Sequence, residues 1–319
     1  MRVYVLRRVL YSLFILFLVS ILIFALGRVL PGDPVQAVLA ASRMGPVDSE
    51  VIRDLKTQFG LDRPLVMQYV IWVAGFVRGD WGVSIATGES VRAMFMHRLP
   101  ITLELFLGSV LWSCIIGLPC GIASALKRNS WLDLTCTTGA IMGVSIPVFW
   151  EGIVLIYLFS VLVHVFPPSG YVPFAEDPLG NLMSVAMPTF IMGTQGAGLL
   201  SRFVRSSLLE VLGQDFIRTA RAKGLREKAV ILTHAMRPAM IPVVTITGLA
   251  WGYVVAGSFI VEYMFAIPGL GRMGVNAIFC NDFPVIQATL IMVALNILAV
   301  NLAVDLLYGA LDPRVRVHR

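Results

Sequence analysis

Charged side chains are scarce in this sequence. They make up 14% of its 319 residues, whereas hydrophobic residues make up 57%. A typical soluble domain is about 25% charged, and a soluble fold of this length could not bury so much apolar surface. The composition therefore excludes a soluble enzyme, a disordered chain and a collagen, and it favours a polytopic α-helical membrane protein.

Cysteine is also rare, and the short motifs that mark many enzymes are missing. None of the four cysteines forms a C-x-x-C pair, and the four histidines are scattered, so the sequence indicates neither a disulfide scaffold nor a metal site. No nucleotide-binding G-x-x-x-x-G-K-[ST] loop is present, because none of the four lysines follows a glycine. We therefore expect no catalytic, cofactor-binding or metal-binding residue in this chain, and energy for uphill transport has to come from ions or from a partner.

Long apolar runs are what the sequence has instead. A membrane-spanning helix needs about 20 apolar residues, and six runs reach that length. They are Val9–Leu30, Ile101–Leu126, a span within Trp131–Val165, Leu182–Leu200, Ala239–Val261 and Pro284–Tyr308. The third run is longer than one crossing needs, so we expect it to be tilted or partly interfacial. The predicted fold is all-α, because lipid offers the backbone no other hydrogen-bond partners.

Basic residues are distributed unevenly between the two sides of this predicted bundle. If the N-terminus is cytoplasmic, 16 of the 25 Lys and Arg residues fall on the inner side, eight of them in segment 202–237. The outer segments that follow the third and fifth spans together hold only Arg272. An excess of Lys and Arg marks the cytoplasmic side of a membrane protein, so we expect both termini to be cytoplasmic.

The outer segment after the first span, residues 31–100, is the long one, and it holds seven acidic and seven basic residues. Within it, Asp48–Phe59 is predicted to form a short amphipathic helix. Leu65–Phe76 is rich in aromatic and apolar residues, which suits a helix at the membrane interface. We expect a small helical cap and not an independent domain.

Small residues and one carboxylate stand out inside the predicted spans. The pairs Gly117/Gly121, Gly139/Gly143 and Gly248/Gly252 have the spacing that lets two helices approach closely. Glu151 lies well inside the third span, where a charge is costly. Two interpretations stay open: Glu151 lines a cavity and meets a cationic group on a substrate, or it makes a structural hydrogen bond or an interfacial contact.

Segment 202–237 is the substantial inner loop, and it predicts a short helix with a sharp end. Asp215 is a candidate N-cap, and Phe216, Ile217 and Ala220 are predicted to share one face. Gly224 is placed to end the helix in a left-handed turn, and a second helical stretch, Leu225–Met236, leads back to the membrane. Such a projecting helix suits docking into a groove of a partner; the alternative is a loop that only binds anionic lipid headgroups.

Motifs along the whole length resemble one known family. Residues Arg205–Leu225 look like the coupling loop, or EAA loop, of ABC importer permeases, more narrowly of the dipeptide, oligopeptide and nickel group. The other similar motifs are Leu6–Arg8, Leu30–Pro34, Gly60–Leu65, Gly79–Ser84, Arg98–Glu104, Phe265–Arg272, Pro284–Gln287, Asn301–Tyr308 and Leu311–Arg316. The chain departs from the general EAA pattern at Arg218–Ala220, where Glu-Ala-Ala is usual, and Glu151 stands where an uncharged residue is expected.

The resemblance implies a type I ABC importer permease fold with a MetI-like core, in the inner membrane of a bacterium. This chain would be the first permease of a heterodimer, with a second homologous permease, two ABC ATPase subunits, an extracytoplasmic substrate-binding protein and membrane lipids as partners, and without nucleic acid. ATP and magnesium would sit in the ATPases. The residues implied in ATPase coupling are Asp215, Phe216, Ile217, Arg218, Thr219, Ala220, Arg221, Lys223 and Gly224, with Glu151 as the candidate cavity residue.

The expected organisation has four regions. They are residues 1–30 (N-terminal tip and first span), 31–100 (outer helical loop), 101–308 (permease core with loop 202–237) and 309–319 (cytoplasmic tail). The leading cargo is a di- or oligopeptide, with a nickel chelate, glutathione or an oligosaccharide as alternatives. An ion-coupled secondary transporter, which predicts inverted repeats and paired intramembrane charges, and a structural membrane protein are the rival classes.

Overall fold

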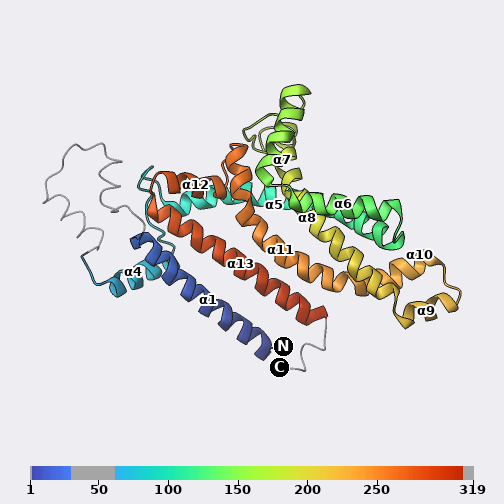
Figure 1. Cartoon of the computed structure of the whole chain (residues 1–319). Coiled ribbons are helices and arrows are strands. Elements are labelled where there is room, and N and C mark those ends of the chain that lie inside the picture. Colours follow the sequence, from blue (N-terminus) through green and yellow to red (C-terminus); the bar gives the residue numbers. More distant parts are fainter. Residues whose placement is uncertain (1, 30–61, 312–319) are drawn as a thin grey trace. The chain divides into compact units, whose positions relative to one another are not determined.

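The computed structural model describes residues 2–29 and 62–311, and every regular element in these ranges is a helix, which confirms the predicted all-α fold (Figure 1). The chain divides into two compact units. One comprises Met1–Val9, Leu103–Ile267 and Ala299–Arg319, and the other comprises Leu10–Thr102 and Pro268–Leu298. The predicted helix over Asp48–Phe59 and the basic tail at 314–319 lie outside the described residues.

The described chain runs through a series of α-helices and two π-helices, η1 and η2. In order they are α1 (Arg2–Val29), α4 (Leu65–Arg78), α5 (Val91–Leu126), α6 (Trp131–Ser145), α7 (Val148–Leu155), η1 (Ile156–Leu162), α8 (Pro178–Leu212), α9 (Asp215–Ala222), α10 (Glu227–Ala229), η2 (Val230–Ala235), α11 (Met236–Met264), α12 (Leu270–Phe279) and α13 (Phe283–Leu311).

The unit of Leu10–Thr102 and Pro268–Leu298 has a core where α12 packs against the first turns of α5 and α13. The buried residues of this core are Val91, Met94, Phe95, Leu270, Met273, Ala277, Val285 and Ala288. The Asp282 carboxylate accepts hydrogen bonds from the Ser84 hydroxyl and from the backbone N–H of Ile85, so the loop before α5 is fixed to the turn before α13. The predicted helix over Leu65–Phe76 is confirmed as α4, which ends at Gly79 in a left-handed conformation, φ +87°.

The other unit is organised around α8, which packs extensively against α6 and α11. Glycines allow this packing. A Cβ atom placed on Gly121 of α5 would lie 2.7 Å from the carbonyl oxygen of Ser201, and one on Gly198 of α8 would lie 2.5 Å from that of Ala140. The predicted close approach is therefore seen at Gly121, whereas no atom of the described residues lies within 4 Å of such an atom on Gly139.

Six spans were predicted, and fewer of the described helices qualify as membrane spans by length and composition. In the described part of the chain, three helices are long and apolar enough to cross a membrane, namely Val5–Gly27, Val91–Leu126 and Phe283–Val304, and a bent pair would make a fourth. Helix α5 begins at Val91, ten residues before the predicted start at Ile101. The fourth and fifth predicted spans fall within α8 and α11.

The third apolar run, expected to be tilted or partly interfacial, consists of two helical segments that meet at 103°. The first, α6, ends at Ser145, and the second begins at Val148. Pro147 explains the break, because its ring has no N–H to donate and disfavours a helical conformation of the preceding residue. Ile146 accordingly has an extended backbone, with ψ 126°.

We predict that Gly198→Ala destabilises the protein, because the new methyl group would press on the backbone of α6. Overpacking of this kind costs about 1–3 kcal/mol, and a thermal-unfolding scan of the detergent-solubilised protein should show it as a lower transition temperature. The matched control is Gly139→Ala, where the methyl group enters open space. Equal stability of the two variants would contradict the packing described for Gly198.

Candidate functional site

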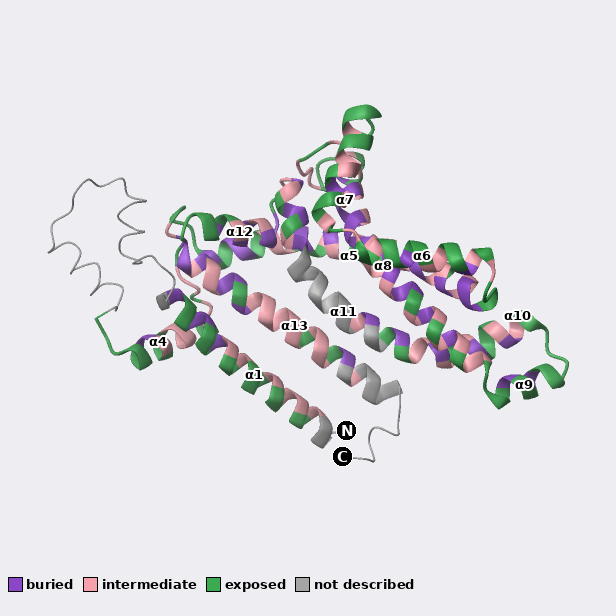
Figure 2. Ribbon diagram, in the orientation of Figure 1, coloured by how far each residue is buried: buried purple, intermediate pink, exposed green. Residues whose placement is uncertain are grey.

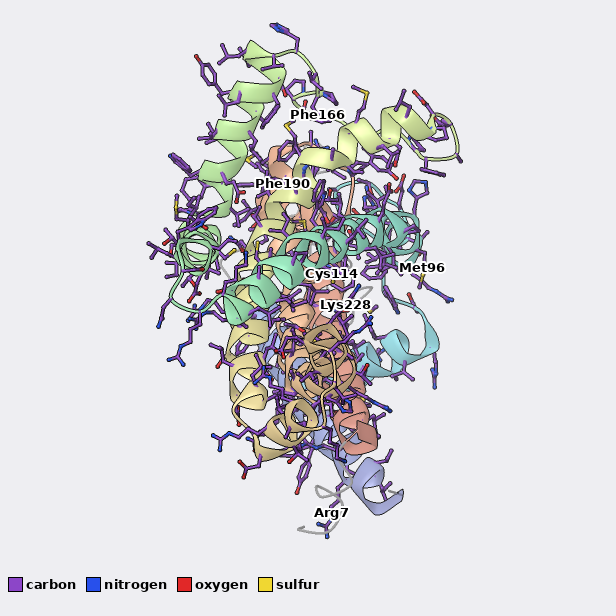
Figure 3. All side chains as sticks on the ribbon, turned by 90° about the vertical axis from the view of Figure 1, so that its right-hand side faces the viewer. Arg7, Met96, Cys114, Phe166, Phe190 and Lys228 are labelled. Carbon is purple, nitrogen blue, oxygen red and sulfur yellow. The ribbon has the colours of Figure 1, made fainter. Side chains whose placement is uncertain are left out.

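The best candidate for a functional surface is the segment that connects α8 to α11, residues 213–235, here called the connecting segment. It lies where the ends of α8 and α11 come together (Figure 1), and Figure 3 views that end of the chain with Lys228 of α10 labelled. Gly213 closes α8 with its N–H bonded to the Glu210 carbonyl, 3.2 Å away. After Gln214, whose backbone is extended, the chain enters α9.

One face of α9 is buried. Ile217 is fully buried and Ala220 nearly so, and the two side chains enter an apolar cluster at the ends of α5, α8 and α11. The other buried members of this cluster are Ala125, Leu208, Val230, Ala235 and Ala239. Burial of this face stabilises α9, which at eight residues is too short to be stable alone.

The opposite face of α9 is exposed, and Figure 2 shows buried and exposed positions on this helix. Arg218, Thr219 and Lys223 are exposed. Phe216 is 48% exposed, so the prediction that it shares the inner face with Ile217 and Ala220 is wrong. The physical reason is angular: adjacent residues are about 100° apart on a helix, so Phe216 lies at the edge of the face that Ile217 and Ala220 bury, and its ring stays half exposed.

Asp215 is not the N-cap that the sequence suggested. It is the first residue of α9, and the N-cap position is taken by Gln214, whose side chain makes no capping hydrogen bond. The Asp215 carboxylate accepts a hydrogen bond from Arg218, 3.2 Å away, in an exposed ion pair. A carboxylate in the first turn still stabilises the helix through the helix dipole.

Gly224 ends the helix as the sequence predicted. Helix α9 finishes at Ala222, Lys223 is the C-cap, and Gly224 has φ +76°, in the left-handed region that favours glycine. Its N–H donates to the Arg221 carbonyl at 2.9 Å. The chain then turns back toward α11, so Gly224 sets the length of the projecting helix.

An ion pair closes the turn that Gly224 makes. Arg221 donates to both carboxylate oxygens of Glu227, at 2.6 and 3.0 Å, and these hydrogen bonds hold the pKa of the Glu227 carboxyl below its ordinary value. The predicted second helix over Leu225–Met236 is found as two pieces, α10 from Glu227 and the π-helix η2 from Val230. The connecting segment is thus a helix, a left-handed turn and a π-helical return.

Glu151 lies in the first turn of α7, directly after the break at Pro147, and is half-buried. The Thr194 hydroxyl of α8 lies 3.0 and 3.1 Å from its two carboxylate oxygens and donates to them. A carboxylate offers about four acceptor positions, so this single donor leaves capacity for a further cationic or hydrogen-bonding group.

The arrangement is suited to binding. In residues 2–29 and 62–311 no three His, Cys, Asp or Glu side chains are grouped so that they could hold a metal ion. The exposed face of α9 offers one aromatic ring among several cations, which are typical contacts of a protein–protein interface.

Two polar contacts in this unit were not predicted. Asp133 of α6 accepts hydrogen bonds from Arg205 of α8, and the Tyr171 hydroxyl donates to Glu104 at 2.6 Å. Burial, reinforced by the Glu104 carboxylate, raises the pKa of Tyr171 above its ordinary value. A capping-box pattern, Ser130-x-x-Asp133 before an apolar run, was the available signal for Asp133; for the other contact the partners are too far apart in sequence.

Comparison with known proteins gives two matches to family descriptions. The family described as binding-protein-dependent transport system inner membrane component matches residues 117–317. Its N-terminal counterpart, described as the N-terminal part of a binding-protein-dependent transport system membrane component, matches residues 1–106.

Relatives and solved structures agree with these matches. The chain is 39% identical over 312 residues to a Brucella abortus (strain 2308) protein named "Putative peptide transport system permease protein". It is 38% identical over 314 residues to the glutathione transport system permease protein GsiC of Escherichia coli (strain K12). Both alignments cover 98% of each chain. A chain of the MetNI methionine ABC transporter in an inward-facing conformation superposes with TM-score 0.57 and 19% identity, covering 69% of this chain and 96% of that one.

We predict that Glu227→Gln loosens the connecting segment at neutral pH. Loss of this exposed ion pair should speed amide hydrogen exchange in residues 215–229 by roughly two- to fivefold. Because the pKa of Glu227 is lowered in the folded chain, the pair is intact above the ordinary Glu pKa and is lost as pH falls through the lowered value. Wild-type exchange, corrected for intrinsic rates, should therefore approach that of the variant only in acid.

The control is Glu210→Gln, which changes an exposed glutamate on α8 outside this ion pair. Mass-spectrometric exchange of the same peptides should be unchanged in that variant. If both substitutions had equal effects, or neither had any, the ion pair would not be what holds the turn.

Proposed function

The chain belongs to the binding-protein-dependent transport system inner membrane component family and is an ABC importer permease, and from this we propose that its connecting segment docks an ATPase subunit. The family that the sequence motifs resembled is thereby confirmed. The protein is a multi-pass membrane protein and not itself a catalyst; ATPase and binding-protein partners follow from the family.

The observation that carries the proposal is the division of α9 into two faces. Ile217 and Ala220 fix the helix to the ends of α5, α8 and α11, while Phe216, Arg218 and Lys223 are presented outward. A helix held on one side and open on the other is a rigid projection that a groove in a partner can move. The lipid-binding alternative does not need the sharp left-handed end at Gly224.

In the proposed assembly this chain pairs with a second homologous permease, and each permease receives one ATPase. ATP and magnesium are bound by the ATPases, whose closure draws the two docked helices together and switches the spans from inward-open to outward-open. An extracytoplasmic binding protein delivers cargo to the opened path. The proposed topology has six spans, including α8, α11 and the bent third run, with both termini and the connecting segment in the cytoplasm of a bacterium.

The proposed cargo is a di- or oligopeptide, supported by relatives named for peptide and glutathione transport at 38–39% identity. A nickel chelate, free glutathione or an oligosaccharide are the other outcomes. Glu151, placed at the break in the third run with acceptor capacity left over, would meet a cationic group such as a peptide amino terminus. Mass spectrometry of the ligand carried by the cognate binding protein identifies the cargo class.

We predict that the tagged chain purifies from membranes with two ATPase subunits.

We also predict that Gly224→Val impairs the coupling of ATP hydrolysis to cargo uptake. A β-branched residue in a left-handed conformation is strained by roughly 1–2 kcal/mol, so α9 should lengthen or change direction. Cargo uptake into proteoliposomes should fall while ATP hydrolysis continues.

The matched control is Gly213→Val, at a glycine with φ −82° where a side chain is allowed. It should retain most of the uptake. Unchanged uptake in Gly224→Val would remove the support for docking by α9, and accumulation of cargo by the chain without any ATPase would favour the ion-coupled secondary transporter.

A second prediction concerns Glu151. Glu151→Gln should lower uptake of a cationic peptide about tenfold relative to a neutral one, since a hydrogen bond to a charged group is lost. Thr194→Val is the control: it removes the hydroxyl partner but keeps the carboxylate, so the ratio of the two uptake rates should stay near the wild-type value. Equal losses for both peptides in Glu151→Gln would assign Glu151 a structural role.

A further inference from the structure

An ion pair between a buried carboxylate and a partly exposed guanidinium group joins α6 to α8 close to the connecting segment. Arg205 forms two parallel hydrogen bonds with Asp133, from Nε to Oδ1 at 2.7 Å and from Nη2 to Oδ2 at 2.8 Å. Asp133 is 5% exposed. This two-pronged geometry is the strongest that an ion pair adopts and it fixes the relative orientation of the two side chains.

The surroundings of Asp133 form a complete polar site. Its carboxylate also accepts hydrogen bonds from the Ser124 hydroxyl at the end of α5, from the Asn129 N–H in the α5–α6 turn at 2.9 Å, and from the Thr137 hydroxyl at 3.2 Å. Arg205 Nε lies 3.0 Å from Ser124 Oγ as well. The end of α5, the turn and the start of α6 thus hold one guanidinium group from α8.

Separating the Arg205 and Asp133 side chains is costly in free energy. Removing Arg205 would leave the buried Asp133 carboxylate without its counter-charge, which is strongly unfavourable. The contact therefore behaves as a fixed joint, in contrast to the exposed ion pairs of α9, which are screened by solvent.

The position of Arg205 on α8 places the ion pair between the connecting segment and the contact to the third run. Arg205 lies two helical turns before Leu212, where α8 ends and the segment leading to α9 begins. Thr194, which holds Glu151, lies on the same helix eleven residues earlier, or about 16 Å along the axis. Helix α8 therefore carries the contact to the bent third run, then the joint, and ends where the connecting segment begins.

We propose that Arg205 and Asp133 are positioning residues that transmit the movement of the connecting segment to the α5–α6 turn, so that the third run moves when an ATPase moves α9. The inference rests on the proposed docking function. It assigns to this pair the link to the α5–α6 turn, whereas α9 itself packs against apolar side chains of α5, α8, η2 and α11.

The first experiment measures cargo transported per ATP hydrolysed by the complete importer in proteoliposomes. Arg205→Met should lower this ratio at least about fivefold, while the ATPases still co-purify and hydrolyse ATP. Arg205→Lys keeps the charge without the planar fork and should give an intermediate ratio. Arg202→Met, which removes an exposed arginine of the same helix, is the matched control and should leave the ratio unchanged.

The second experiment uses the intact pair and does not depend on the folding of a charge-deleted variant. Spin labels are placed at Lys127 and Glu210, two exposed positions on either side of the joint, with the native cysteines replaced by alanine. The distance between the labels should be the same without nucleotide and with ATP and vanadate. A shift of several ångströms would show that the α5–α6 turn and the end of α8 move independently, which overturns the proposal.

The two proposals fail differently. If the wild-type complex lacks ATPases or shows no ATP-driven uptake, the docking function is wrong. If the wild-type complex transports normally and Arg205→Met transports as much cargo per ATP as Arg202→Met, docking stands and the joint is wrong.

Discussion

The burial of Ile217 and Ala220 is the interaction on which the functional surface depends. These two side chains are enclosed by the ends of three long helices, and they hold an eight-residue helix that has too few internal hydrogen bonds to persist alone. Because the anchoring contacts are apolar and lie on one side only, every charged side chain of α9 is left on the outside. The same constraint that stabilises the helix thus creates its binding face.

Much of this arrangement follows from short-range sequence signals. The left-handed end at Gly224, the helix before it and the apolar runs of the long helices are local properties, and residue type alone fixes them. The face occupied by Phe216 and the cap position of Asp215 were predicted wrongly because three-residue patterns leave the helix phase uncertain by one residue. The bend at Pro147 was signalled by a proline, but its angle is set by packing against other helices.

Contacts between distant residues could not be predicted from one sequence. Asp133 and Arg205 are 72 positions apart, and each had a plausible local role, one as a residue of a first helical turn and the other as a positive charge of an inner loop. Only the close approach of α5, α6 and α8, which Gly117, Gly121 and Gly198 allow, brings them together. Small residues thus determine where polar partners meet, although they make no polar contact themselves.

The π-helix η2 has a consequence for how α11 responds to its neighbours. The hydrogen bond of a π-turn spans one residue more than that of an α-turn, and so closes a larger ring of backbone atoms. If η2 became regular α-helix, the register of the residues that follow would shift by one, and α11 would rotate by about 100° around its own axis. Helix α11, which follows Ala235, can therefore rotate about its own axis relative to α9 when η2 changes its hydrogen bonding. Helix α8 has no such π-helical segment, because it is α-helical from Pro178 to Leu212.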